Sequence, residues 1–452
     1  MKISYSIREN NVSSTFPLAG RCFSPLTGLG VQIGSFLQGR SDSPLICLGA
    51  QLTGVHYLLD RPEPKSSYHV GGSGLLEFEA FIKCIAETGE RYSQLVSGIE
   101  NEHLIGFTTY DELKASHGDE LLDLSCFDFF TPAQLSQPGF PFRSFGSASK
   151  YGFIRLESLI GGWHRWVPVQ LVLLGYNVRD RKGEQRILSA VTTGTATHTH
   201  RVKCLKNAIL ELIQIDSAMG NWYGHSRSTR IVLDERTKNL SSILSKTLSD
   251  KSYEAGFYLL PNPDLAGFTI ACLIDNGHRI PSMVVGLGCC TSLESAMYKA
   301  FIEAVSCHQL ARVISFKELF PENGIKREAR IDTSNIADLD TNVFYYSLPQ
   351  NRISLLERFD TGVTMSASEA PRDMEGSEQH QTKMLIDSFR TSGKELLFLD
   401  LTAHEVSELG MVTYRIWSPD TLSLSIPSFP TLAHKRYNDY GNIQHTGVHP
   451  LP

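Results

Sequence analysis

The sequence contains no apolar run long enough to cross a membrane as a helix. Its strongest apolar run, at 166–176, is far shorter than the roughly 20 residues that a spanning helix needs, and Pro168 and Gln170 interrupt it. The first residues, MKISYSIRENN, lack the apolar core of a secretory signal. These absences predict a cytoplasmic protein with no membrane partner.

The sequence also lacks a block of basic residues. Its 42 Lys and Arg residues are outnumbered by 48 Asp and Glu residues, which gives a formal net charge of −6 at pH 7. Proteins that bind the phosphates of nucleic acids normally carry a basic patch, so nucleic acid is not an expected partner. The nine cysteines are odd in number and include no CxxC pair, which is typical of a reducing compartment rather than of a disulfide framework.

Several common catalytic motifs are missing as well. The sequence has no GxSxG nucleophile elbow, no Walker A lysine loop and no GxGxxG dinucleotide fingerprint. At 452 residues, with 41% hydrophobic and 20% charged residues, the chain is nevertheless typical of a globular protein. Its length favours one large domain or about two to three smaller ones.

Residues 71–94, GGSGLLEFEAFIKCIAETGERYSQ, combine a small-residue segment with a helical pattern. The first four residues predict a loop whose free N–H groups would face a phosphate at the helix start. The helix places Glu87, Glu90 and Arg91 on one face, because positions i, i+3 and i+4 project the same way. Two such carboxylates suit a hard cation such as Mg²⁺. Taken alone, the spacing of Lys83, Glu87 and Arg91 favours an ordinary solvated face with weak ion pairs, and the segment gains significance because a similar plan recurs.

Two later segments follow the same plan, in which a glycine near a strand end precedes a helix with a carboxylate. A strand at 186–196 precedes a helix at 202–223, and paired strands at 267–274 and 282–288 precede a helix that begins with a capping box at 291–294. The intervals from Gly74 to Glu87, Gly194 to Glu211 and Gly288 to Glu303 are 13, 17 and 15 residues. If the three helices converge, their acids form an oxygen-rich site that is costly unless cations bind there.

The rest of the chain is expected to be arranged around these units. Residues 1–65 predict a strand-rich lead-in, and residues 66–452 the main domain. Further strands are predicted at 166–176, 396–401 and 411–417, and Arg415 in the last strand would face either phosphate or the surface. Residues 366–383 are polar and interrupted by Pro and Gly, which predicts a loop or mobile segment, and the carboxyl end is rich in proline.

These segments resemble the motifs of the YcaO superfamily. The first helix reads Glu87-Thr-Gly-Glu90-Arg91, similar to ExxER. The second unit reads Thr193-Gly-Thr-Ala196 and then Glu211-Leu-Ile-Gln214, similar to an (S/T)-G-x-A loop followed by ExxE. The third reads Ala300-Phe-Ile-Glu303-Ala304, similar to AxxEA, and the chain ends in His449-Pro450-Leu451-Pro452, similar to the azoline-forming branch. The resemblance, over roughly residues 65 to 452, implies an α+β domain with mixed or antiparallel sheets, flanking helices and three related strand–helix units.

The resemblance implies an ATP-dependent cyclodehydratase. In such enzymes a Cys, Ser or Thr side chain of a ribosomal precursor peptide attacks the preceding backbone carbonyl, whose oxygen accepts the γ-phosphoryl group of ATP. Phosphate then leaves and a thiazoline or oxazoline remains, as in bacteriocin biosynthesis. The protein mainly has to position the reactants and neutralise phosphate charge, with ATP and Mg²⁺ as its cofactors.

The resemblance also assigns roles to individual residues. Nucleotide binding would involve Ser73, Lys83, Glu87, Glu90, Arg91, Glu211, Gln214 and Glu303. The metal ligands among them would be Glu87, Glu90, Glu211 and Glu303. The catalytic residues would be His449, Pro450 and Pro452, with the carboxylate of Pro452 as the base at the reacting peptide.

The sequence departs from the family pattern at several positions. Many members have lysine at the position of Ser73 and serine at that of Lys83. The second helix usually has an acid and an arginine where this chain has Gln214 and Ile215, so one negative charge and one phosphate clamp are lost. These changes keep open the alternative of a non-catalytic subunit that binds peptide or a partner. A thioamide-forming YcaO enzyme, against which the HPLP terminus argues, and an unrelated binding protein with surface acids are further alternatives.

The resemblance implies protein partners beside the precursor peptide. Azoline-forming members commonly need a peptide-docking domain related to ubiquitin-activating enzymes. Residues 1–65 leave no room for it, so a separate E1-like docking protein is expected. An FMN-dependent azoline dehydrogenase is a candidate further partner, and a homodimer is a candidate assembly.

Overall fold

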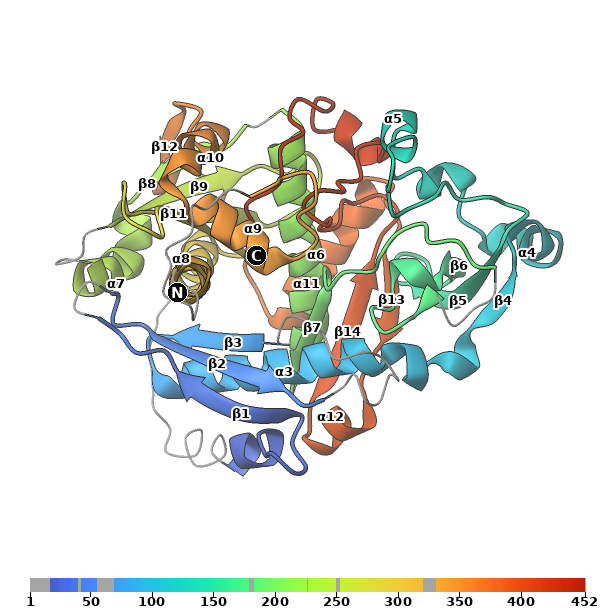
Figure 1. The fold of residues 1–452 in the computed structure, drawn as a ribbon, viewed down its shortest axis with the longest axis horizontal. Helices are drawn as coiled ribbons and strands as arrows, with labels where there is room; N and C mark the ends of the chain where they lie inside the picture. Colours follow the sequence, from blue (N-terminus) through green and yellow to red (C-terminus); the bar gives the residue numbers. More distant parts are fainter. Residues whose placement is uncertain are drawn as a thin grey trace.

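A computed structural model describes residues 17–39, 42–54, 69–178, 183–225, 227–248, 253–319 and 331–451. These residues form three β-sheets with helices between and around them, which confirms the predicted α+β class (Figure 1). The expected boundary at residue 65 lies outside the described residues. No helix in the described ranges is both long enough and apolar enough to cross a membrane.

The first sheet carries the helix with the ExxER segment. Its antiparallel strands are β1 (Gly30–Ser35), β2 (Ile46–Leu52) and β3 (His69–Gly74), and α3 (Glu77–Glu100) packs across β3 and β2. The loop expected at 71–74 is wrong, because these residues belong to β3 and pair with β2. A Cβ at Gly72 would lie 2.2 Å from the carbonyl oxygen of Ala80, so glycine is needed here for close strand–helix packing.

The second sheet has the spatial order β4 (Gly106–Thr109), β5 (Lys150–Ser158), β13 (Leu397–Asp400), β14 (Val412–Trp417) and β7 (Thr195–His198), with β6 (His164–Pro168) paired to β5. The helix α6 (Arg201–Tyr223) packs on β7 and β14. The shorter helices α4 (Tyr110–His117) and α12 (His404–Glu408) contact β4 and β14 of this sheet, while α5 (Pro132–Leu135) lies farther from its strands in Figure 1. The strands predicted at 396–401 and 411–417 are confirmed.

Two strands predicted near this sheet are largely wrong. The strand at 166–176 ends at Pro168 and gives way to a 3₁₀ turn, Val169–Leu171, and the segment 186–194 is irregular up to β7. A side chain replaces strand pairing here: the oxygen of the Gln170 amide accepts the N–H of Ile187 at 2.9 Å, and its nitrogen donates to the carbonyl oxygen of Gln185 at 2.9 Å. Backbone groups satisfied in this way need no neighbouring strand.

The third sheet has the order β11 (Met283–Cys290), β10 (Phe268–Asp275), β9 (Glu254–Leu260), β8 (Thr229–Val232) and β12 (Thr364–Ser366), and the β10–β11 hairpin is as predicted. It is accompanied by α7 (Lys238–Leu248), α8 (Leu293–Leu319), α9 (Leu339–Ser347) and α10 (Arg352–Phe359). The capping box expected at the start of α8 does not form. The N–H of Leu293 donates to Asp373 at 2.9 Å, while the Glu294 carboxylate accepts the N–H of Leu240.

The segment 366–383, expected as a loop or mobile stretch, is ordered in a different way. Arg236 donates to the carbonyl oxygens of Ala370 and Pro371 and to the carboxylate of Asp373, which holds the irregular part. The helix α11 (Glu378–Thr391) then begins within the predicted loop, and Ser377 caps it. A run of polar residues therefore conceals the start of a helix.

Three strand–helix units recur in the fold, as predicted: β3 with α3, β7 with α6, and β11 with α8. The helix α6 contacts strands of both the second and the third sheet, so it is the central element of the molecule (Figure 1). The helices α3 and α6 also share the strands β7 and β14. This arrangement brings residues of three distant segments to one place.

Candidate functional site

Glu87, Glu90 and Arg91 lie together on one face of α3. Arg91 places Nη2 3.6 Å from Oε1 of Glu87 and Nη1 3.8 Å from Oε1 of Glu90. The other oxygen of Glu87 accepts the N–H of Gly71 at 3.1 Å, which ties this face to β3. The side chains of Arg91 and Glu90 are only 32% and 15% exposed. This face of α3 is therefore only partly solvated.

The acids of α6 and α8 approach the same arginine. Burial alone would lower the pKa of Arg91, yet the charges of Glu90, Glu87, Glu211 and Glu303 raise it. Such electrostatic effects act over short distances inside a protein, so Glu211 from α6 and Glu303 from α8 lie near the end of Arg91. The three helices thus converge on one cluster, which we call the acid cluster: Glu87, Glu90, Glu211 and Glu303, with Arg91.

Three members of the acid cluster have raised pKa values. Burial raises the pKa of Glu90 to about 7, and Glu87 adds to the shift while Arg91 opposes it. Burial and then the charge of Glu90 raise the pKa of Glu211 well above its usual range. Burial and then the charge of Glu87 raise the pKa of Glu303 to about 7. Since part of each shift comes from another carboxylate, the cluster holds more negative charge than Arg91 balances.

Solvent can reach the acid cluster although protein surrounds it. Glu303 is exposed, whereas Glu90 and Glu211 are half-buried. The Glu303 side chain thus keeps contact with solvent, although the protein around its carboxylate raises its pKa. A carboxylate in this environment is accessible to a charged ligand from solution.

Arg415 is a second cation beside the acid cluster. It lies in β14, is only 2% exposed, and donates from Nη1 to the carbonyl oxygen of Val191 (2.6 Å) and to Oγ1 of Thr195 (3.1 Å). Burial lowers the pKa of Arg415 to about 10, while Glu211 and Glu90 oppose this shift. The surface position considered for Arg415 is therefore wrong. The available signal was an arginine within an otherwise uncharged strand, VTYRIW.

Ser73 and Lys83 lie at the edge of the acid cluster. The Lys83 ammonium donates to the carbonyl oxygen of Ser73 at 2.9 Å and pairs with Glu79 at 2.8 Å. The hydroxyl groups of Ser73 and Ser306 are 2.5 Å apart, and Ser306 is three residues beyond Glu303 on α8. The charge of Lys83 also acts to lower the pKa of Glu303, although burial and Glu87 outweigh it. Both predicted residues are thus brought to the site.

Gln214 and Ile215 contribute no charge to the acid cluster. Gln214 is half-buried on α6, three residues beyond Glu211, and its amide has no hydrogen-bond partner among the described residues. Ile215 is 8% exposed and packs in a hydrophobic cluster with Tyr258 and Leu260. No charged side chain at Gln214 or Ile215 therefore replaces the arginine that the family pattern has at the position of Ile215.

The cluster fits a cation that shares its ligands with phosphate. In the described part of the chain, no three His, Cys, Asp or Glu side chains are arranged to hold a metal ion by themselves. Mg²⁺ does not require such a cage, because it is commonly bound by one or two carboxylates together with waters and substrate phosphates. Oxygen donors with raised pKa values are a suitable set for it, and the individual metal ligands remain predictions.

The carboxyl-terminal tail is inserted into the core. Asn342 on α9 donates its amide to the carbonyl oxygens of His449 (2.5 Å) and Leu451 (3.0 Å), and Tyr346 donates to that of Val448. Pro450 and Cys307 line the same small hollow between the tail and α8. Burial and then the charge of Glu303 raise the pKa of Cys307, so the tail passes close to the acid cluster. Pro452 lies outside the described residues.

His449 is an anchor of this tail. It is fully buried, its Nε2 lies 2.8 Å from the carbonyl oxygen of Ser425, and its Nδ1 accepts the N–H of Leu451 at 3.3 Å. Burial lowers the pKa of His449 to about 4. A neutral imidazole with both nitrogens engaged is better suited to holding the tail than to the catalytic role expected for it.

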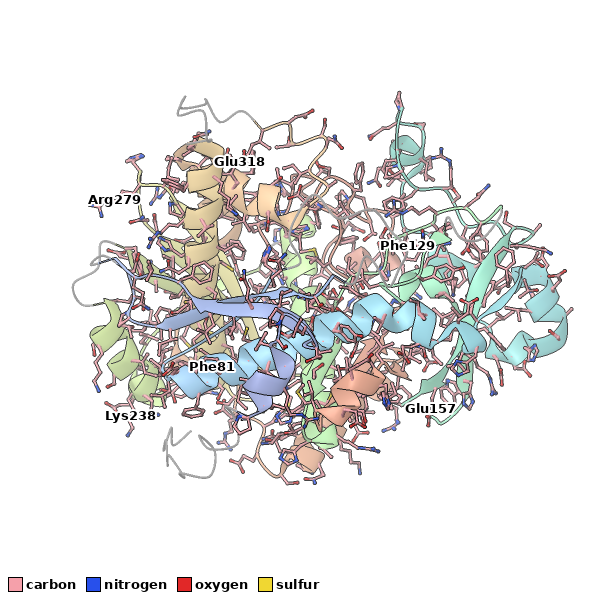
Figure 2. All side chains as sticks on the ribbon, turned by 60° about the horizontal axis from the view of Figure 1, so that its bottom comes forward. Phe81, Phe129, Glu157, Lys238, Arg279 and Glu318 are labelled. Atoms are coloured by element: carbon pink, nitrogen blue, oxygen red, sulfur yellow. The ribbon has the colours of Figure 1, made fainter. Side chains whose placement is uncertain are left out.

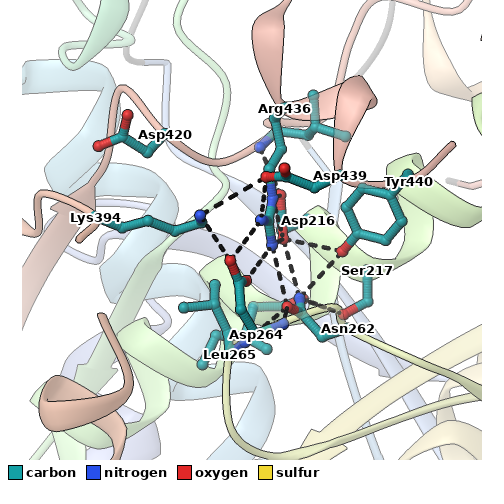
Figure 3. A network of polar contacts seen from close by, with 12 residues as sticks. Asp216, Ser217, Asn262, Asp264, Leu265, Lys394, Asp420, Arg436, Asp439 and Tyr440 are labelled. Atoms are coloured by element: carbon teal, nitrogen blue, oxygen red, sulfur yellow. Dashed lines mark hydrogen bonds and ion pairs between the residues drawn. The ribbon is translucent and has the colours of Figure 1, made fainter. Parts of the chain in front are cut away.

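A buried ion-pair network connects the tail segment to α6 (Figure 3). The side chains of Arg436 and Asp216 are 1% and 0% exposed, and Nη2 of Arg436 lies 2.8 Å from Oδ2 of Asp216. Arg436 also contacts Asp264 and Asp439, and Lys394 pairs with Asp264. Asp216 is five residues beyond Glu211, so the network holds the carboxyl-terminal segment against the helix that supplies Glu211.

The sequence matches one protein-family model. That family is described as YcaO cyclodehydratase, ATP- and Mg²⁺-binding, and the match covers residues 71–422. The match includes the whole acid cluster, Arg415 and the three helices α3, α6 and α8, and ends before the tail. No curated protein matches the sequence.

Three solved structures share the fold. A heterocyclase in complex with substrate and cofactor has a TM-score of 0.69 at 16% identity, covering 91% of this chain and 52% of its own. YcaO from Methanopyrus kandleri bound with AMPPCP and Mg²⁺ has a TM-score of 0.57 at 16% identity, covering 88% and 87%. The E. coli microcin synthetase McbBCD complex has a TM-score of 0.61 at 14% identity, covering 95% and 98%. The chain thus spans about half the length of the first of these proteins.

Proposed function

Because the chain belongs to the YcaO family, we propose that it is an ATP-dependent cyclodehydratase that acts on a ribosomally made peptide. The observation that carries this proposal is the convergence of Glu90, Glu211 and Glu303 on Arg91. Four acids outnumber the two nearby arginines, Arg91 and Arg415, which favours a bound cation. Such a group of acids suits a metal–nucleotide complex. The match to an ATP- and Mg²⁺-binding family supports this assignment.

The acid cluster would hold Mg²⁺ through its carboxylates. Ionised Glu90, Glu211 and Glu303 would share the ion with the phosphates, while Arg91 neutralises part of their charge. Bound there, Mg²⁺ would offset the negative charge that develops on the phosphates. Lys83 and Ser73 lie at the edge of the cluster, where an ammonium and a hydroxyl would bind further phosphate oxygens.

The reaction itself follows from the poor leaving ability of an amide oxygen. A Cys, Ser or Thr side chain loses its proton and bonds to the preceding carbonyl carbon, and the carbonyl oxygen takes the γ-phosphoryl group, which releases ADP. The nitrogen then loses its proton, the C–O bond breaks, and phosphate leaves as a C=N bond forms. One azoline, one ADP and one phosphate result for each peptide side chain and ATP consumed. The protein's part is positioning and charge neutralisation.

The tail would supply the base for this reaction. Leu451 is buried, and Asn342 donates a hydrogen bond to its carbonyl oxygen. The nearby hollow lined by Pro450 and Cys307 lies against α8, the helix that carries Glu303. In this proposal the carboxylate of Pro452 would accept the proton of the attacking side chain or of the amide nitrogen.

The peptide and a docking protein are proposed as partners. The likeness to a heterocyclase with bound substrate and to the McbBCD complex supports a peptide substrate and a multi-protein assembly. An FMN-dependent dehydrogenase that oxidises the azolines would act after this chain.

Mass spectrometry of the peptide product tests the proposal. The purified chain, a candidate docking protein, a cysteine-rich precursor peptide and Mg-ATP are combined, and the peptide should lose one water for each ring while ADP accumulates. Glu303→Gln should abolish ring formation. Glu318→Gln is the matched control, because Glu318 lies on the same helix but is exposed at its far end (Figure 2). Equal activity of the two variants would overturn the proposal.

A non-catalytic subunit is the second candidate function. The observation that favours it is the replacement of an acid and an arginine by the uncharged pair Gln214 and Ile215. Such a subunit would bind the precursor peptide tightly and leave it unmodified, with no ADP formed. The same assay distinguishes the two functions when peptide binding is measured beside turnover.

A further inference from the structure

The hydrogen-bonding capacity of Arg415 is only partly used within the protein. A guanidinium has five N–H donors, and the hydrogen bonds of Arg415 to described residues all come from Nη1. Its Nε is buried and has no partner. The edge formed by Nε and Nη2 is thus unused by the described residues. This is the edge through which arginine binds carboxylates and phosphates with two parallel hydrogen bonds.

The charge of Arg415 also lacks a direct partner. Arg415 forms no ion pair with a carboxylate in the described ranges, although it is 2% exposed. The acids that act on it electrostatically are Glu211 and Glu90, both of the acid cluster. A buried cation without a paired anion is costly, so its retention at this place calls for a ligand that supplies the anion.

We infer that Arg415 binds phosphate oxygens of the nucleotide through its unused Nε–Nη2 edge. The inference rests on the proposed function, since it names a further ligand-binding residue of the same site. Arg415 would restore from β14 the phosphate clamp that Ile215 does not provide on α6. A phosphate chain carrying Mg²⁺ would then lie between the guanidinium and the carboxylates of Glu211 and Glu90.

The surroundings of Arg415 fix its orientation. Nη1 is held by the carbonyl oxygen of Val191 and by Oγ1 of Thr195, both in the segment that precedes α6. The carbonyl oxygen of Gly194 in this segment accepts the N–H of Ile416, the residue after Arg415. The guanidinium is therefore oriented before any ligand arrives, and less entropy is lost when it binds.

A series of ligands with increasing phosphate number tests this inference. Dissociation constants of adenosine, AMP, ADP and ATP with Mg²⁺ are measured for the wild-type chain, Arg415→Gln, Arg415→Lys and the control Arg155→Gln. Arg155 is an exposed arginine on β5 that pairs with Glu120. Loss of a charge-assisted pair should weaken binding by about 10- to 100-fold, beginning with the ligand whose phosphate meets Arg415. Adenosine should bind Arg415→Gln and the wild type equally.

The outcomes of this series distinguish a phosphate-binding role of Arg415 from a purely structural one. A loss of the same size for adenosine and ATP, or no loss for any ligand, would overturn the inference while leaving the proposed function intact. Arg415→Lys keeps the positive charge but lacks the planar guanidinium, so it should lose less affinity than Arg415→Gln. If Arg415→Gln does not fold, the affinity of Arg415→Lys tests the inference. If the wild type binds neither ATP nor Mg²⁺-tripolyphosphate, both the inference and the proposed function are wrong. If the wild type binds tripolyphosphate but not ATP, and the Arg415 variants lose this binding, then Arg415 binds phosphate but the site is not a nucleotide site.

Discussion

The ammonium of Lys83 on α3 lies 2.9 Å from the carbonyl oxygen of Ser73 on β3. In the family pattern these positions carry the opposite residues, a lysine on the strand and a serine on the helix. In this chain, the lysine reaches the strand position from the helix. The chain therefore retains a cation at this edge of the acid cluster.

This relationship predicts that the two positions can be exchanged together. Lys83→Ser should weaken Mg-ATP binding by about tenfold, as expected when one charge-assisted hydrogen bond to phosphate is lost. The double variant Ser73→Lys, Lys83→Ser should regain most of this affinity, because the ammonium returns from the strand. Calorimetric titration measures both constants, with the exposed Lys317→Ser on α8 as the control. Failure of the double variant to improve on Lys83→Ser would contradict a phosphate-binding role for Lys83.

The acid cluster predicts opposite pH dependences for stability and for ligand binding. Glu90 and Glu303 have folded-state pKa values of about 7, above the ordinary value of 4.5, so the native state binds more protons between these limits. Their contribution to the free energy of unfolding is therefore present at low pH and falls as the pH rises from about 4.5 to about 7. Mg-ATP needs the ionised carboxylates, so its affinity should rise over the same window.

Thermal unfolding with and without Mg-ATP measures this linkage. The increase in melting temperature caused by Mg-ATP should be larger at pH 8 than at pH 5.5, and Glu303→Gln should reduce the difference. The phosphates of the nucleotide also titrate, but they do so equally with Glu303→Gln and with the control Glu318→Gln. A difference in pH dependence between the two variants therefore reports on the Glu303 carboxylate. Equal pH dependences in the two variants would show that Glu303 does not face the ligand.

The buried pair of Arg436 and Asp216 predicts a large loss of stability when one partner is removed. Arg436→Gln leaves Asp216 in the core without its counter-charge, which should lower the free energy of unfolding by about 3–5 kcal/mol. Glu120→Gln removes one partner of the exposed pair with Arg155 and should cause no detectable change. Denaturant unfolding gives both values. A loss in Arg436→Gln no greater than in Glu120→Gln would mean that the network does not stabilise the fold.

The clamp formed by Asn342 predicts a separation of ring closure from nucleotide binding. Asn342→Leu removes the donor to the carbonyl oxygens of His449 and Leu451, so the tail loses this anchor. The rate of ring closure should fall by about tenfold or more, because a small displacement of a reacting group slows a reaction strongly. The affinity for Mg-ATP should stay unchanged. Deletion of residues 451–452 should have the same effect in stronger form. Unchanged turnover in the deletion variant would remove the tail from the mechanism.

The helices and their acids could be predicted because their determinants are local. The 3.6-residue pattern of 202–223 agrees with α6, and the i, i+3, i+4 spacing places Glu87, Glu90 and Arg91 on one face of α3. Their convergence with Glu303 was conditional on tertiary packing that periodicity does not contain. The ATP-dependent reaction was predicted from the resemblance to a family and not from the periodic pattern.

The errors arise where distant residues decide the local structure. The glycines at 71–74 serve close packing of β3 on α3, so a pattern typical of a phosphate loop is in fact a strand. Asp373, 80 residues away, caps α8 in place of the local capping box. Arg415 remained ambiguous because only the folded chain shows that its strand is buried beside Glu211 and Glu90.

A crystal structure of the chain with Mg²⁺ and a non-hydrolysable ATP analogue tests the central claim most directly. We predict that the triphosphate lies between α3, α6 and α8, with Mg²⁺ bound by at least one carboxylate of the acid cluster. A nucleotide bound elsewhere, or a cluster that contacts neither metal nor phosphate at saturating ligand, would contradict it.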